Sequence, residues 1–285
     1  METRISSATR EVAIGEGQPT VLIGERINPA GKKRLAEALK AGDMEVVRAE
    51  AVAQAEAGAD ILDVNVTTFG IDEVAVLPRA VQAVMEVVGL PLCLDSANPE
   101  ALAAALKVYQ GKPLINSVTG EQESLDSVLP LVREYGAAVV GLVQDDEGIP
   151  RDPERRVAIA HRLVERAEKA GIPRSDLVID CLTLAVGADT GSGVAALETA
   201  RRIKSELGVN LTLAASNISF GLPDRALLNS AFVTMVIAGG VDCLIVDAAR
   251  VRPAVLAADL IMNRDSRARR YIEAYRQRES AQRQE

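Results

Sequence analysis

A series of short apolar runs in this chain ends in an acid or an amide. The endings are Asp63 and Asn65, Asp95, Asn116, Asp180, Asn217 and Asp247, with Glu25 closing another apolar run. Short apolar runs bounded by turn residues are typical of strands buried on both faces. In parallel α/β folds the carboxyl ends of such strands meet at one face, where ligands bind. The pattern therefore predicts one site lined by these side chains.

Acids and amides in this ring favour a neutral, planar, polar heterocycle as ligand. A carboxylate accepts two parallel hydrogen bonds from a ring N–H and a neighbouring amino group, and an Asn amide offers both a donor and an acceptor. The 2-amino-4-oxopyrimidine edge of guanine or of a pterin presents that arrangement, and composition alone leaves both open. The glycine-rich stretch Gly187–Gly193 contains an acid and no Lys, so we interpret it as a rim loop rather than a phosphate cradle.

The single histidine, His161, falls inside a predicted helix, where we expect it at the surface. A Ser-His-Asp triad and the usual zinc sites are therefore excluded. Clustered carboxylates could hold Mg²⁺ or Ca²⁺. Because three of these eight side chains are amides, which are weak ligands for hard cations, we expect no metal in the site.

The elements that must position these residues alternate along the chain. Predicted strands begin near residues 21, 61, 90, 114, 138, 177, 211 and 242, and a predicted helical stretch follows each of them. Asn98 and Pro99 form a helix start signal, and Gly42 with Asp43 interrupts the helical pattern of residues 33–57. The alternation predicts a single-domain α/β fold, a (β/α)₈ barrel over residues 21–263, with an open doubly wound sheet as the alternative.

The two ends of the chain have different compositions from the barrel. Residues 1–20 are expected to form a loose N-terminal lead-in, and residues 264–285 an Arg-rich helix or tail packed by Ile272 and Tyr275. A net charge of -8 and an aromatic content of 2% argue against a nucleic-acid partner. No apolar run reaches the roughly 18 residues of a membrane helix. The three cysteines, Cys93, Cys181 and Cys243, lie in or just after apolar runs, which predicts free buried thiols in a reducing cytoplasm.

Several segments resemble the pterin-binding methyltransferase family, which includes methyltetrahydrofolate:corrinoid/iron–sulfur protein methyltransferase and the folate module of cobalamin-dependent methionine synthase. The matching segments are Gly24–Asn28, Gly58–Val66, Cys93–Asn98, Ile115–Ser117, Leu177–Asp180 and Ser216–Ser219. Their order and spacing cover the chain from Val21 to about Met262. The resemblance implies a (β/α)₈ barrel, usually homodimeric, that acts on tetrahydrofolate, 5-methyltetrahydrofolate or a related tetrahydropterin.

The resemblance also implies roles for individual residues. Asp95, Asn116 and Asp180 would anchor the pterin, Asn217 would be the catalytic residue beside N5, and Arg225 would lie near the substrate. Secondary candidates are Glu25, Asp63, Asn65 and Ser219. Phe220 departs from the polar residue common at its position. The chain carries no Asp-x-His-x-x-Gly motif, so cobalamin is expected on a separate corrinoid-binding protein.

Two other functions stay open. A dihydropteroate-synthase-like enzyme needs cations for pyrophosphate, but the chain has Ser216-Asn217-Ile218-Ser219 where that enzyme carries a Ser-Arg-Lys type motif, which disfavours it. A non-catalytic folate-binding barrel would keep the ring of acids and amides without turnover.

Overall fold

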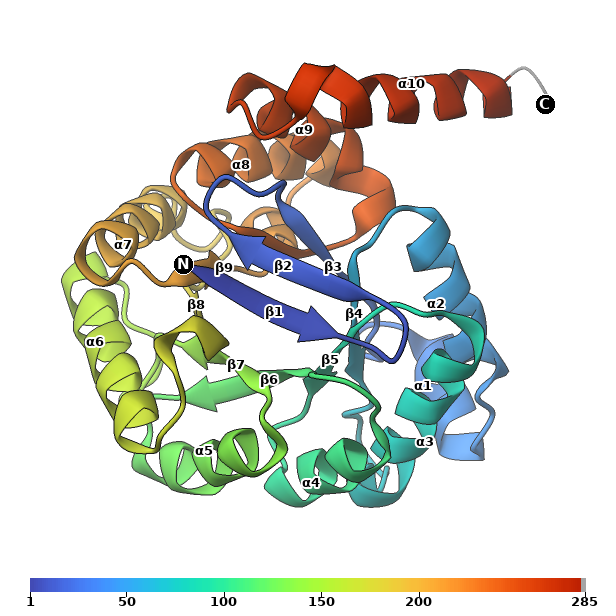
Figure 1. Cartoon of the computed structure of the whole chain (residues 1–285), viewed down its shortest axis with the longest axis vertical. Coiled ribbons are helices and arrows are strands. Elements are labelled where there is room, and N and C mark those ends of the chain that lie inside the picture. Colours follow the sequence, from blue (N-terminus) through green and yellow to red (C-terminus); the bar gives the residue numbers. More distant parts are fainter. Residues whose placement is uncertain (283–285) are drawn as a thin grey trace.

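An eight-stranded parallel sheet curves into a barrel at the centre of the computed structural model, which describes residues 1–282 (Figure 1). The strands are β3 (Val21–Ile27), β4 (Ile61–Asn65), β5 (Leu92–Asp95), β6 (Leu114–Thr119), β7 (Ala138–Leu142), β8 (Leu177–Asp180), β9 (Asn210–Thr212) and β10 (Cys243–Val246), in the order β10-β3-β4-β5-β6-β7-β8-β9. Backbone hydrogen bonds from Asp242 to Leu211 and from Ile245 to Leu213 join β10 to β9. The predicted (β/α)₈ barrel is confirmed, and the open sheet is wrong.

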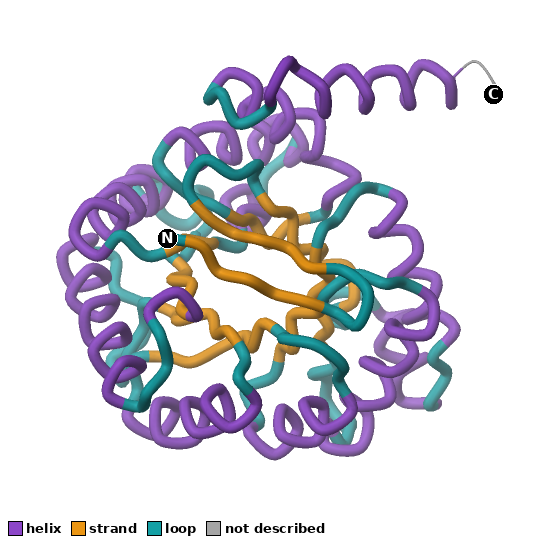
Figure 2. Tube along the Cα trace, in the orientation of Figure 1, coloured by secondary structure: helices purple, strands orange, loops and turns teal. Residues whose placement is uncertain are grey.

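Helices follow the strands and surround the sheet (Figure 2). They are α1 (Lys33–Ala41), α2 (Glu45–Glu56), α3 (Glu73–Val87), α4 (Pro99–Val108), α5 (Gln122–Tyr135), α6 (Pro153–Lys169), α7 (Ser192–Leu207), α8 (Arg225–Ala238), α9 (Ala248–Ile261) and α10 (Arg269–Gln282), with 3₁₀ turns η1 (Arg174–Asp176), η2 (Ala215–Ser219) and η3 (Ser266–Ala268). None of the described helices has the length and apolar character needed to cross a membrane.

Local start and stop signals explain several helix ends. Asn98 caps α4 by accepting the backbone N–H groups of Glu100 and Ala101, as the Asn98-Pro99 pair predicts. Gly42 ends α1 with φ +72°, a left-handed conformation that glycine adopts without steric cost. The break between α1 and α2 is therefore where the sequence predicts it. Two helices follow β3 as a result, whereas one helix follows most of the other strands.

The N-terminal segment is not loose, so that expectation is wrong. Strands β1 (Glu2–Ser6) and β2 (Glu11–Gly15) form an antiparallel hairpin that lies across one end of the barrel (Figure 1). Ile5 and Ile14 are fully buried in the cluster of apolar side chains that fills the barrel. Asn210 of β9 donates hydrogen bonds to Thr3 Oγ1 and to the carbonyl of Ile14. Alternation of polar and apolar residues in this short, charged stretch is the signal that the expectation overlooked.

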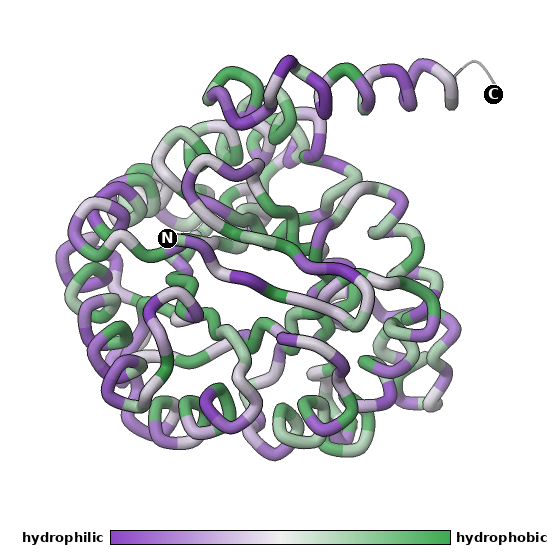
Figure 3. The backbone as a smooth tube through the Cα atoms, viewed as in Figure 1, coloured by the Kyte–Doolittle hydropathy of each residue, from purple (hydrophilic) through white to green (hydrophobic). Residues whose placement is uncertain are grey.

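At the other end, α10 runs away from the barrel and is mainly hydrophilic (Figure 3). Ile272 and Tyr275 are 40% and 51% exposed, so they do not pack the helix as predicted, whereas Ala274 is buried. Polar contacts hold the start of α10, because Arg270 pairs at 2.9 Å with Asp259, a fully buried residue of α9. Residues 283–285 of the predicted tail lie outside the described part of the chain.

Candidate functional site

The interior of the barrel changes from apolar to polar along the strands. Side chains in a strand alternate between the two faces, so residues two apart point the same way. The cluster inside the barrel includes Ile23, Ile61, Cys93, Leu114, Val178 and Ile245. Two residues further along the same strands stand Glu25, Asp63, Asp95, Asn116, Asp180 and Asp247. Acids and amides therefore line the carboxyl end of the barrel, as the sequence predicts, and we call this end the mouth.

Two of these side chains stand level on adjacent strands with Asn65, which lies two residues beyond Asp63 in β4. Asn65 of β4 is in register with Asp95 of β5, and Asp95 is in register with Asn116 of β6. Neighbouring residues in a parallel ladder project to the same side, so an amide, a carboxylate and a second amide form one row. This row offers donors and acceptors to the edge of a flat ligand.

Asp63 lies beneath this row and is 2% exposed. The side-chain amide of Asn116 donates to Asp63 Oδ1 at 3.3 Å. Burial, and then the negative charge of Asp95, raise the pKa of Asp63 well above its ordinary value. Burial also raises the pKa of Asp95, but hydrogen bonds from Asn65 and Asp63 oppose that rise. A neutral Asp63 thus supports an ionised Asp95, because two adjacent buried carboxyl groups cannot both ionise.

A cavity of about 350 Å³ opens beside the row. Asp95 and Asn116 line it, together with Ser117, Leu142 and Gln144. Its size is at the lower end of the range for small-molecule pockets. Asp180 and Asn217 are not among the lining residues and lie on the β8 and β9 side of the mouth.

Asp180 is 4% exposed at the end of β8. Its Oδ1 accepts the backbone N–H of Leu182 at 2.7 Å. Burial raises the pKa of Asp180 to about 7, although the Leu182 N–H and the charge of Arg156 favour the ionised form. The second oxygen, Oδ2, has no partner among the described residues and is free to accept a ligand N–H.

Arg156 of α6 holds the backbone next to Asp180. This guanidinium is 1% exposed and donates to the carbonyls of Pro150, Cys181 and Leu182 at 2.7, 3.1 and 2.9 Å. Leu182 has φ +54°, a conformation that L residues seldom adopt without support. Arg156 therefore fixes the turn that presents the Leu182 N–H to Asp180.

Asn217 is exposed in η2, the turn after β9, and its side chain has no partner among the described residues. Arg225 secures this turn from the start of α8. Its Nη2 donates to the Ser216 carbonyl at 2.9 Å and its Nε donates to Ser219 Oγ at 3.0 Å. The predicted Ser219 is buried and acts within this turn. The geometry makes Arg225 a support for Asn217, while its expected contact with substrate stays a prediction.

Glu25 joins the turn to the barrel, because Ser216 Oγ donates to Glu25 Oε1 at 2.7 Å. Burial raises the pKa of Glu25, and Asp247 adds to the rise while Ser216 opposes it. Asp247 forms ion pairs with Arg250 at 3.2 Å and with Arg26 at 3.9 Å. The contacts of Glu25 and Asp247 connect η2, β3 and the start of α9 at the rim.

The predictions for His161 and for the three cysteines can also be checked. His161 lies exposed on α6 and contacts Glu206 at 3.0 Å, as expected for a surface position. The cysteines are buried and unpaired. Among residues 1–282 no group of three or more His, Cys, Asp or Glu side chains is arranged to hold a metal ion.

The sequence reasoning missed Arg156 and Thr212. Arg156 falls on the same helical face as Ile159, Ala160 and Leu163, so a charge on an apolar stripe was the available signal. Thr212 of β9 stands in register with Asp180 of β8 and is fully buried. A single Thr at the end of a three-residue strand carries no such signal.

Comparison with known proteins gives three kinds of match. The family model described as "pterin binding enzyme" matches residues 24–247. The chain is 34% identical to a methylcorrinoid:tetrahydrofolate methyltransferase of Eubacterium limosum, over 90% of this chain and 96% of that protein. It is also 34% identical to the methionine synthases of Mycobacterium leprae and Mycobacterium tuberculosis, over 88% of this chain but 22% of theirs.

Solved structures of dihydropteroate synthase from Xanthomonas albilineans share the fold. The structure with 4-aminobenzoic acid has a TM-score of 0.69 at 24% identity and covers 92% of this chain and 99% of that one. The complex with 7,8-dihydropteroate has a TM-score of 0.68 at 25% identity, with 91% and 98% covered.

Proposed function

Because the chain belongs to the pterin-binding enzyme family, we propose that it is a methyltransferase that moves a methyl group between N5 of tetrahydrofolate and the cobalt of a corrinoid held by a partner protein. The observation that carries this proposal is the likeness to methylcorrinoid:tetrahydrofolate methyltransferase, which extends over 96% of that protein's length. The family resemblance noted in the sequence agrees with it.

The mouth supplies what a pterin needs. The anionic Asp95 and the amides of Asn65 and Asn116 form one row of acceptors and donors. Asp180 Oδ2 offers a further acceptor from the opposite side. A pterin carries an N–H and an amino group side by side, and these pair with carboxylate oxygens. Asp95, Asn116 and Asp180 therefore anchor the ring in this proposal.

Asn217 faces the reacting nitrogen. Departure of the methyl group leaves electron density on N5, and a tertiary amine is a poor leaving group unless N5 is protonated or hydrogen-bonded. An amide cannot supply a proton, but the Asn217 side chain is exposed, has no competing partner, and can orient toward N5. Groups held in place before reaction stabilise developing charge because they need no reorganisation.

The corrinoid comes to the open mouth on its own protein. Phe69, after β4, is 94% exposed, and Phe220, after η2, is 69% exposed. Ile149, after β7, is 41% exposed. These apolar side chains stand on loops at the carboxyl ends of the strands, where a flat macrocycle and its carrier would dock. Phe220 also lies 5.8 Å from the Arg225 guanidinium, so docking contacts adjoin the Asn217 turn.

A homodimer in the cytoplasm completes the proposal. Met235 on α8 and Ile261 on α9 are 52% and 82% exposed, and they provide apolar surface on the outside of the barrel. Buried, unpaired thiols at Cys93, Cys181 and Cys243 suit a reducing compartment. Light scattering on the purified protein measures the subunit number directly.

A synthase of the dihydropteroate kind is the second candidate, favoured by the shared fold. The cationic side chain that contacts the Asn217 turn is Arg225, and its guanidinium already donates hydrogen bonds to Ser216 and Ser219. A pyrophosphate group would find no free cation there among the described residues.

One experiment separates the functions. Purified protein is mixed anaerobically with 5-methyltetrahydrofolate and cob(I)alamin, and the cobalamin absorbance is followed, with Asn217→Ala as the matched control. Methylation of cobalamin by the wild type supports the proposal. Pteroate formation from 4-aminobenzoate and the pterin pyrophosphate would show that the protein is a synthase instead. Tight folate binding without either reaction would show that it is a non-catalytic folate-binding protein.

A further inference from the structure

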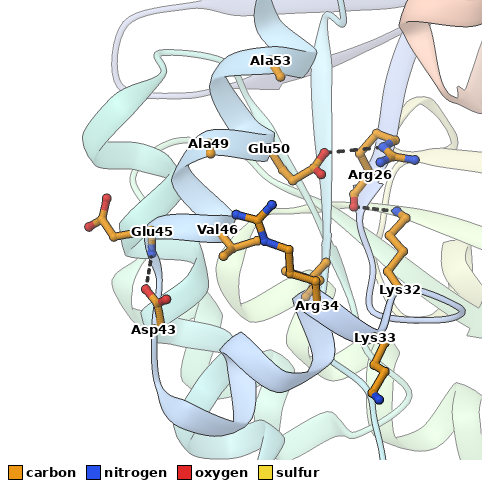
Figure 4. Close-up of a pocket in the computed structure, with 11 residues that line it drawn as sticks. Arg26, Lys32, Lys33, Arg34, Asp43, Glu45, Val46, Ala49, Glu50 and Ala53 are labelled. Atoms are coloured by element: carbon orange, nitrogen blue, oxygen red, sulfur yellow. Dashed lines mark hydrogen bonds and ion pairs between the residues drawn. The ribbon is translucent and has the colours of Figure 1, made fainter.

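A second cavity, of about 840 Å³, lies beside the mouth between the β3–α1 loop, α1 and α2 (Figure 4). Its basic lining residues are Arg26, Lys32, Lys33 and Arg34, and its acidic ones are Asp43, Glu45 and Glu50. None of the roles described for the mouth uses this cavity. We call it the α1–α2 pocket.

The acids of the α1–α2 pocket already have partners. Glu50 pairs with Arg26 at 3.4 Å, and Glu45 pairs at 2.6 Å with Arg48, which is not a lining residue. Asp43 Oδ1 accepts the backbone N–H of Glu45 at 2.9 Å. Of the lining cations, Arg26 pairs with Glu50 and Lys33 pairs at 3.8 Å with Glu37. Lys32 and Arg34 form no ion pair among the described residues, so the pocket suits an anion better than its near balance of charges suggests.

Arg34 has the largest unused capacity. It is exposed on α1, and its guanidinium has neither an ion pair nor a hydrogen bond among the described residues. In Figure 4 it extends from α1 toward Val46 of α2, inside the pocket, whereas the Lys33 ammonium points away from Arg26. Lys32 lies on the mouth side and donates from Nζ to the Arg26 carbonyl at 2.7 Å. Burial, and then Arg26, lower the pKa of Lys32, while Glu50, Glu25 and Asp247 oppose that change.

The α1–α2 pocket connects with the Asn217 side of the mouth. Ser216, next to Asn217, donates to Glu25, and Arg26 follows Glu25 in β3. Arg26 pairs with Asp247, the rim residue at the end of β10. The rim from η2 past β10 to β3 is thus one continuous path that ends at Lys32 and the pocket.

We propose that the α1–α2 pocket binds the carboxylates of the glutamate tail of a reduced folate, and that it favours the poly-γ-glutamylated form. This inference rests on the proposed function. In folates the tail leaves the pterin from C6, the ring atom next to N5, so with N5 beside Asn217 the tail starts beside η2, from which the rim leads past β10 to β3 and the pocket. Carboxylates are repelled by the acids of the mouth and attracted by Lys32 and Arg34, the two pocket cations without an ion pair among the described residues.

The test compares two ligands, tetrahydropteroyl monoglutamate and its tri-γ-glutamate, by calorimetry on the full chain. The tri-γ-glutamate should bind the wild type roughly tenfold tighter, because exposed ion pairs contribute about two- to fivefold each. The difference should shrink at high salt. Arg34→Gln should reduce the preference severalfold, because it weakens binding of the tri-γ-glutamate more than binding of the monoglutamate, which brings fewer carboxylates to the pocket. Lys40→Gln, on the same helix but outside the pocket, is the matched control and should keep the full preference.

The outcomes separate this inference from the proposed function. If both ligands bind equally well to the wild type, or if Arg34→Gln keeps the tri-γ-glutamate preference, the tail does not occupy the α1–α2 pocket although the mouth still binds folate. If neither ligand binds, the proposed function itself fails. Arg34 is exposed and unpartnered, so the variant is expected to fold, and its circular dichroism spectrum confirms whether it does.

Discussion

Asp180 accepts the backbone N–H of Leu182 at 2.7 Å, and this is the one hydrogen bond to its buried carboxyl group within the described chain. Oδ1 is thereby fixed in direction, while Oδ2 has no partner among the described residues. Burial raises the pKa of Asp180 to about 7. The group is therefore poised near neutrality, and its charge changes within the pH range in which the protein can be studied.

Folate binding should weaken as the pH falls below about 7. Oδ1 accepts the Leu182 N–H, so a pterin N–H must pair with Oδ2, and a proton on the carboxyl group competes for that oxygen. Asp180 takes up this proton as the pH falls through its pKa of about 7. Affinity for 5-methyltetrahydrofolate should be constant above pH 8 and fall by up to about tenfold for each unit below 7. Fluorescence titrations between pH 6 and 8.5 measure this. A flat profile would remove Asp180 from the pterin contacts.

Asp180→Asn should stabilise the free protein and abolish tight folate binding. The pKa of Asp180 is about 7 in the folded protein, above the ordinary value of 3.8 that applies to the unfolded chain. The folded state therefore becomes less stable as the pH rises from about 3.8 to about 7, because the buried carboxyl group must ionise. Asn retains the Oδ1 acceptor for Leu182 and cannot ionise, so the free energy of unfolding should rise by up to roughly 4 kcal/mol above pH 7. Thermal unfolding at pH 5 and pH 8 checks this, with the exposed Asp146→Asn as control. A gain that does not grow with pH would contradict the burial argument.

Arg156 should tune Asp180 without touching the ligand. Arg156→Met leaves the carbonyls of Pro150, Cys181 and Leu182 unpaired, which should cost about 3 kcal/mol of stability. It also removes the positive charge that favours ionised Asp180, so the pH midpoint of folate binding should move upward. Arg156→Lys retains the positive charge but forms fewer hydrogen bonds. It should therefore keep the pH midpoint of folate binding close to that of the wild type while still lowering the free energy of unfolding. Arg155→Met, one residue away and paired with Asp145 and Glu147, should leave the midpoint unchanged.

Parts of this arrangement could be predicted from sequence because they depend on local patterns. The apolar runs that end in Asp95, Asn116 and Asp180 predict the strands. Because side chains in a strand alternate between two faces, these runs also predict the face to which each terminal polar side chain points. The row formed by Asn65, Asp95 and Asn116 depends on register between strands, which single runs do not specify. Helical spacing places Arg156 on the apolar face of α6, but tertiary packing decides whether that face buries its charge.

The ends of the chain illustrate the same limit. The hairpin of β1 and β2 is stabilised by contacts with barrel residues far along the sequence, such as Asn210. In α10 the apolar residues Ile272 and Tyr275 stay exposed because a helix that leaves the barrel has little to pack against. Helix formation follows from local sequence, but the choice of buried face requires the surrounding structure.

Asn217→Ala should slow methyl transfer on the order of 10² while changing folate affinity little. The Asn217 side chain has no structural partner, so its removal should not disturb the turn. Loss of one preorganised polar group beside developing charge typically costs about 10² to 10³ in rate. Single-turnover transfer to cob(I)alamin measures the rate, and Asp95→Ala, which removes an anchor, should instead lower affinity more than rate. Gln110→Ala, an exposed amide away from the mouth, is the control. Normal turnover in Asn217→Ala would discard the role.

Arg225 should act on the rate through Asn217, and a double-mutant cycle tests that coupling. Arg225→Met removes the hydrogen bonds to the Ser216 carbonyl and Ser219 Oγ, so the turn holding Asn217 loosens and the transfer rate should fall about tenfold. If Arg225 works only by positioning, the same substitution in the Asn217→Ala background should cost almost nothing, because the group it positions is absent. A direct contact between Arg225 and folate would make the two losses multiply and would lower folate affinity in both backgrounds. The single variants alone do not separate support of the turn from substrate binding, and the cycle does.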